Sequence, residues 1–196
     1  MTTRNDLRTL LEQRTTDTAN AVWSQTEWDG FLDTAIDGLY PTWFKTMTGT
    51  TTAGAGPIQT MPSGAQDLYY VGVQTPTSNR VRVMRGWQEG NGDAVIPKVG
   101  IAGYTLVWAW TAPYTKPANG SATLSIPSEL EEVVILRAHI AALENLLTDR
   151  VKKQAYLSVT VREGASEQEI MLLLNALHDS LDERVAKALP RPERVG

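Results

Sequence analysis

The chain is 196 residues long and 42% of its residues are apolar, which is enough to form one substantial hydrophobic core or two modest ones. Its formal net charge is -4, whereas domains that bind nucleic acid by neutralising phosphates are usually basic, so the composition argues against tight binding of DNA or RNA. The absence of cysteine excludes disulfide scaffolds, thiolate zinc sites and cysteine nucleophiles.

Two helices are predicted near the N-terminus. Residues 3–15 carry leucines at helical spacing, and Thr3 with Asp6 resembles a capping box. The acidic residues of this segment argue against a secretion signal, and no apolar run in the chain approaches the roughly 20 residues that a membrane-spanning helix needs. The second helix is predicted to begin at Thr26, as its N-cap, and to end near Pro41.

Residues 49–126 are predicted to be rich in strands, because they hold most of the glycines and prolines together with β-branched and aromatic residues. Asn91-Gly92 indicates a hairpin. Residues 49–58 contain almost no core-forming side chains and are predicted to be loosely held in the free protein. Partial alternation of apolar and polar residues predicts strands at 67–74, 80–87 and 104–110, with a short strand at 94–97.

The C-terminal third is predicted to be helical. Ser128 and Glu131 form a capping box for a helix that runs to about Tyr156, and its apolar residues cover more than half of its circumference, as in a central helix. A last helix is predicted over 166–189, with an apolar stripe suited to packing on a neighbouring helix. The remaining residues, 190–196, are predicted to be a flexible arm.

The predicted fold class is therefore α+β. Residues 1–48 and 127–189 are expected to form a helical bundle, and 49–126 a β-rich insertion between the second and third helices. Both helical segments contain more acidic than basic residues, whereas the insertion is mildly basic.

The sequence contains no recognisable catalytic or cofactor motif. A phosphate-binding loop and a nucleophile elbow are absent, and the two histidines, His139 and His178, do not have metal-ligand spacing. His139 falls on an apolar helix face. This position favours a histidine that is buried in the core or in a subunit interface, with its ring nitrogens hydrogen-bonded, over one that acts as a ligand or as a proton switch. We expect neither an enzyme activity nor a cofactor.

Three aspartates, Asp29, Asp33 and Asp37, follow one another at intervals of four residues along the second predicted helix. Such a row is most often a solvated helix face, and spacing alone is weak evidence for a cation site or an acid/base pair. A third interpretation is physical: a row of carboxylates facing a channel would repel a passing polyanion.

Some large apolar residues are candidates for contact with partners. Trp108 and Trp110 fall on one face of a predicted strand, where they would be core or interface anchors, or a platform for a stacked ligand. Leu172 projects opposite the stripe of the last helix, which indicates a second contact surface. The interface candidates are Trp87, Trp108, Trp110 and Leu172.

Nearly the whole chain follows one recognisable order of segments. A helix that begins TRNDLRTLLEQR precedes the pattern W-S-x-x-E-W-D-x-F-L-D-x-A-I-D-x-L-Y-P at 23–41. There follow a turn at 60–64, the strand end Arg85-Gly86-Trp87, a strand pair at 103–114, and Ile126-Pro127 before a long Ala/Leu-rich helix. This order resembles the head-to-tail adaptor (connector) proteins of long-tailed bacteriophages.

The resemblance implies a structural role in the virion neck, for a protein made in the bacterial cytoplasm. Adaptors of this family form a ring, commonly of twelve subunits, beneath the portal protein, and they seat a stopper or another neck or tail protein while DNA passes without being bound. No catalysis, cofactor or membrane is involved. In such a ring, Asp29, Asp33 and Asp37 are candidates for lining the channel. The candidate portal-docking arm is Pro190, Arg191, Pro192, Glu193 and Arg194.

Two alternative functions stay open from the sequence. The first is another neck protein, a stopper or a tail terminator, although those are expected to consist mainly of strands. The second is a ligand-binding α+β domain whose pocket would use the tryptophans and the aspartate row.

Overall fold

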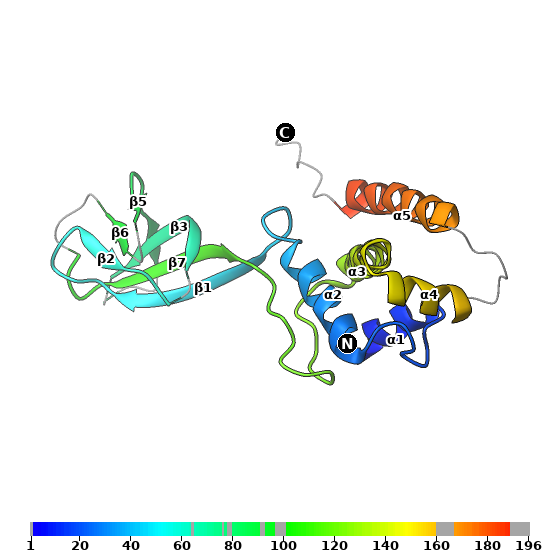
Figure 1. Cartoon of the computed structure of the whole chain (residues 1–196). Helices are drawn as coiled ribbons and strands as arrows, with labels where there is room; N and C mark the ends of the chain where they lie inside the picture. The colour runs from blue at the N-terminus through cyan, green and yellow to red at the C-terminus, as the bar shows by residue number, and fades with distance from the viewer. Residues whose placement is uncertain are drawn as a thin grey trace. The chain divides into compact units, whose positions relative to one another are not determined.

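The computed structural model describes residues 2–63, 65–75, 77, 80–90, 93–96, 101–159 and 167–188. The chain forms two compact units, one made of Met1–Leu39 with Tyr114–Gly196 and the other of Tyr40–Pro113. The described helices belong to the first unit and the described strands to the second (Figure 1). The fold class is α+β, with the strands between the second and third helices, which confirms that prediction.

The helical unit is built around its third helix. α3 packs against each of the other helices, and 11 of its 21 residues are buried, which confirms that it is a central helix. In Figure 1, α3 lies between α5 and α1. None of the helices in the described part of the chain is long and apolar enough to cross a membrane. The helices are α1 (Arg4–Arg14), α2 (Gln25–Asp37), α3 (Ser128–Thr148), α4 (Arg150–Val159) and α5 (Glu167–Ala188).

The first two helices begin at capping boxes. At α1 the predicted pair is confirmed, because the Thr3 amide donates to the Asp6 carboxylate and the Asp6 amide donates to the Thr3 hydroxyl. At α2 the prediction of Thr26 as N-cap is wrong. Ser24 caps the helix together with Glu27, so α2 starts two residues earlier, and it ends at Asp37, before Pro41.

The long helix predicted from Ser128 to Tyr156 is broken, and its predicted capping box is absent. Its N-cap is Pro127, which has no side chain to accept a hydrogen bond, and Ser128 is already the first helical residue. The break lies at Asp149, whose backbone is extended (φ -109, ψ 102). The Asp149 carboxylate accepts from the amides of Val151 and Lys152, at 3.0 and 3.1 Å, and so begins α4. Aspartate competes in this way for amides that would otherwise continue a helix.

The β unit contains two antiparallel sheets. One has the strand order β1-β7-β3-β4, the other β2-β6-β5. The core of this unit is formed by side chains from within the unit, with Trp108, Leu106 and Val71 fully buried. The strands are β1 (Lys45–Thr52), β2 (Ile58–Thr60), β3 (Gln66–Gln74), β4 (Val81–Val83), β5 (Gln88–Glu89), β6 (Asp93–Val95) and β7 (Thr105–Ala112).

β1 contradicts the prediction of loose structure for residues 49–52, the part of 49–58 that the strand contains. It pairs with β7 in one continuous register along all of its residues. The strand needs no large apolar residues of its own, because β7 supplies the tryptophans, and threonine is a good strand former. Gly49 lets β1 approach closely, since a Cβ there would lie 3.1 Å from the Trp110 ring, and the ring would have to shift by a few tenths of an ångström to accept it.

Candidate interaction surfaces

The aspartate row of α2 is not a free acidic surface. Asp29 accepts a hydrogen bond from Arg8 at 3.1 Å, Asp33 is paired with Arg4, and Asp37 is 2.6 Å from the Lys116 Nζ. Arg4 is itself buried, so Asp29 and Asp33 join α2 to α1 by ion pairs inside the subunit, whereas Asp37 pairs with a residue of the segment between β7 and α3. Asp29 and Asp33 are thus paired with arginines of α1, whereas Asp37 is exposed and paired at the surface. Lining of a channel by the three carboxylates stays a prediction.

Of the alternatives predicted for Trp108 and Trp110, the structure supports core anchors and contradicts an interface or a stacking platform. Trp108 is fully buried, with its indole N–H donating to the Thr51 hydroxyl at 2.7 Å, and Trp110 is 5% exposed. Trp87 is half-buried and packs against the same core. These side chains hold the β unit together, so Trp108 and Trp110 are not available to a partner or to a stacked ligand.

Leu172 remains the exposed apolar residue that the sequence indicated. α5 buries Ile170 and Leu174 and half-buries Leu177, Leu181 and Val185, so most of its predicted stripe packs on α3. Leu173, which the prediction also placed in the stripe, is exposed. Leu172 lies on the opposite side of α5 and is 68% exposed.

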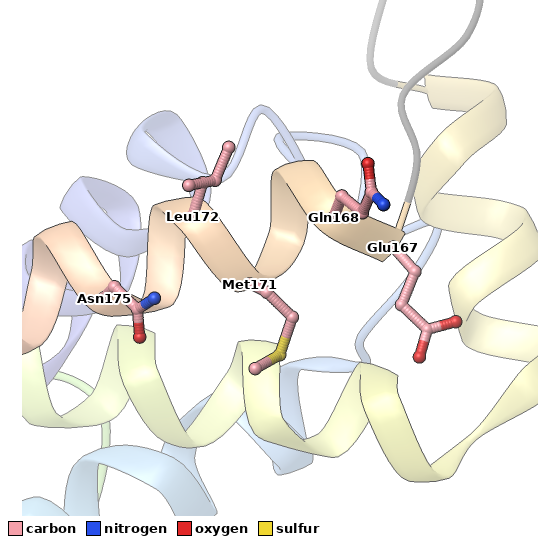
Figure 2. Close-up of a pocket in the computed structure, with 5 residues that line it drawn as sticks. All are labelled: Glu167, Gln168, Met171, Leu172 and Asn175. Atoms are coloured by element: carbon pink, nitrogen blue, oxygen red, sulfur yellow. The ribbon is translucent and has the colours of Figure 1, made fainter.

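Around Leu172 the surface is an open hollow of about 600 Å³. The described residues that line it come from α5, and Met171 and Leu172 project from the helix in different directions (Figure 2). Met171 is 45% exposed. A flexible methionine beside an exposed leucine is typical of surfaces that bind other proteins. The lining residues are Glu167, Gln168, Met171, Leu172 and Asn175.

The sequence analysis did not identify Met171 and the polar residues around it. Part of the signal was present, because 168, 172 and 175 recur at helical spacing on the side of α5 opposite its packing stripe, whereas Met171 lies on the flank between the two sides. The hollow contains one carboxylate and no histidine, and the described residues of the chain hold no group of three or more acidic or histidine side chains that could bind a metal ion. The arrangement is suited to burying an apolar side chain of a partner.

His139 is buried in α3, as predicted, but the expected hydrogen bonds are absent. Neither ring nitrogen has a partner among the described residues. Burial, with a smaller contribution from the Arg14 cation, lowers the pKa of His139 from 6.5 to about 4. Arg14 is itself paired with Glu132 at 2.9 Å. His139 is therefore neutral in the folded protein at neutral pH.

His139 should make the protein less stable as the pH falls. The unfolded chain takes up a proton near pH 6.5 while the folded chain does not, so stability is lost between about pH 6.5 and 4. We expect a loss of about 2 kcal/mol in the free energy of unfolding between pH 7 and pH 5. Urea titrations at both pH values should show that His139→Leu removes this loss, and an equal loss in the variant would contradict the assignment.

The predicted portal-docking arm, residues 190–196, lies outside the described residues. The same holds for Ser166 and for the Asn91-Gly92 hairpin signal. Portal docking by the arm therefore stays a prediction.

Comparison with known proteins identifies no family for the chain. No family model matches it, and no curated protein matches it. One solved structure to which the chain is similar bears the description "Neck of empty GTA particle computed with C6 symmetry". The identity is 14%, the match covers 76% of this chain and 75% of that chain, and the TM-score is 0.28. A likeness of this size establishes neither a shared fold nor a shared function.

Proposed function

We propose that the chain is a structural virion protein, a head-to-tail adaptor that forms a ring beneath a portal. In this role it connects the capsid to the next neck or tail component and leaves a channel for DNA, which passes without being bound. Its partners would be the portal protein, a stopper or other neck protein, and further copies of itself in a ring of about twelve subunits, the number typical of the family that the sequence resembles. The role needs no enzyme activity and no cofactor, and it places the protein in the virion neck.

The observation that carries this proposal is the exposed apolar side of α5. α3 already covers the packing side of α5. Leu172, which is 68% exposed, and Met171, which is 45% exposed, are therefore not needed for packing inside the helical unit. Apolar side chains of this kind are what a protein-protein interface buries at its centre. The order of segments along the chain, including a β-rich unit between α2 and α3, agrees with the adaptor resemblance.

The proposal can be tested with one substitution on α5. Leu172→Glu places a charge in the hollow without touching the α3 contact, so we expect the chain to bind portal rings at least tenfold more weakly, which is about 1.4 kcal/mol. Binding is measured with immobilised portal rings from the same genome.

Ser180→Glu is the matched control, because Ser180 is also exposed on α5 but lies outside the hollow. Both substitutions should change the free energy of unfolding by less than about 0.5 kcal/mol, as is usual for surface positions. Equal binding by Leu172→Glu and the parent would rule out the hollow as the contact. If the parent does not bind the portal at all, the adaptor function is wrong.

A further inference from the structure

β1 forms one edge of the four-stranded sheet, and the side away from β7 is unpaired in the described part of the chain. The Ala53 amide donates to the Tyr104 carbonyl at 2.8 Å, in line with the β1–β7 register. Backbone groups alternate in direction along a strand. The odd-numbered residues of β1 therefore bond to β7, and the N–H and C=O groups of the even-numbered residues point outward. These residues are Thr46, Thr48, Thr50 and Thr52, and all four are exposed.

This edge lacks the devices that normally prevent strand addition. Exposed edges are usually short, bulged, or interrupted by proline or charge. β1 has eight residues, its register with β7 has no shift, and it contains neither proline nor any charge except Lys45 at its first position. The opposite edge, β4, is protected, because it has three residues with Arg82 at its centre.

We propose that β1 pairs with the β1 strand of a second copy of this chain, antiparallel and centred on Gly49, to form a two-fold dimer of the free protein. In that register Thr46 lies opposite the second copy's Thr52 and Thr48 opposite its Thr50. Every outward N–H and C=O group of the four threonines then has a partner. Cross-strand threonine pairs are favourable, and Lys45 lies opposite Ala53, so no like charges meet. The strand is complementary to itself.

The contact is separate from the adaptor role. A two-fold contact uses the same surface on both copies and closes as a dimer, so it does not build a ring. It joins two four-stranded sheets into one continuous sheet. The dimer is a property of the free protein. A failure to dimerise would not bear on portal binding, and a failure to bind the portal would not bear on the dimer.

Sedimentation velocity over a concentration series tests the proposal on the full chain. We expect a concentration-dependent monomer–dimer equilibrium. Thr48→Lys with Thr50→Lys places lysines opposite each other across the two-fold axis and should weaken the dimer at least tenfold. Val81→Lys with Val83→Lys adds the same charges to the opposite edge, where both valines are exposed, and should leave the dimer unchanged.

Hydrogen exchange on the unmodified protein gives a second readout that does not depend on the variants folding. The amides of Thr46, Thr48, Thr50 and Thr52 should become protected as the concentration rises, and those of β4 should not. Three results would overturn the proposal. The protein could stay monomeric up to about 1 mM, or it could dimerise without protection of these amides. The dimer could also survive the lysines on β1 and be lost with the lysines on β4.

Discussion

Asp17→Ala is expected to lower the free energy of unfolding by about 4 kcal/mol, the largest effect of any single charged residue in the described helical unit. Asp17 is 1% exposed and lies in the loop between α1 and α2. Its carboxylate accepts from the amides of Ala21, Val22 and Trp23 at 2.7, 3.1 and 3.0 Å. Removing it would leave these donors unpaired in a buried site, which costs more than the net value of the hydrogen bonds themselves.

The effect should extend beyond the loop, because Asp17 positions Trp23. That indole is fully buried, 4.7 Å from the Trp28 ring and 5.8 Å from the Tyr156 ring, so it links the loop to α2 and α4. Urea unfolding of Asp17→Ala measures the loss, with Asp182→Ala on the exposed side of α5 as the control. Asp17→Asn keeps one acceptor oxygen and should lose less. A change below about 1 kcal/mol for Asp17→Ala would contradict this role.

The second large effect is expected from Trp108→Ala, which should destabilise the β unit by about 3–5 kcal/mol. Trp108 is fully buried at the centre of the sheet core and bonds to Thr51. The substitution would leave a large cavity among side chains that all belong to the β unit. The loss should therefore be confined to that unit.

Residue-resolved hydrogen exchange separates a local loss from a global one. The amides of β3 and β7 should exchange much faster in Trp108→Ala, while those of α2 and α3 should keep the parent's protection. Equal acceleration in α3 would mean that the two units unfold together. As a control, Tyr69→Ala on an exposed position of β3 should change little.

Local patterns accounted for the features of the fold that depend on neighbouring residues in sequence. The Thr3–Asp6 cap lies within one helical turn, and the packing stripe of α5 repeats along one helix, so both could be predicted. Burial of His139 was also predictable from its place on an apolar face.

Features that depend on a distant partner could not be predicted. β1 is a strand because β7 covers it with tryptophans, and its own sequence lacks the apolar alternation that usually indicates a strand. Asp29 and Asp33 looked free because their partners belong to α1, and only the packing of α1 on α2 brings them together. The partner of Asp37 is Lys116, which is also distant in sequence. The candidate site was predicted in part: exposure of Leu172 followed from helical spacing, whereas the hollow beside it required the structure.

We propose that this chain assembles as a ring on a portal. Native mass spectrometry of purified portal rings mixed with an excess of the full chain tests it directly. We expect one dominant complex, heavier than the portal ring by a fixed integral number of copies of this chain, with Leu172→Glu failing to form it at the same concentration. Portal rings that keep their own mass in the presence of excess parent protein would contradict the claim.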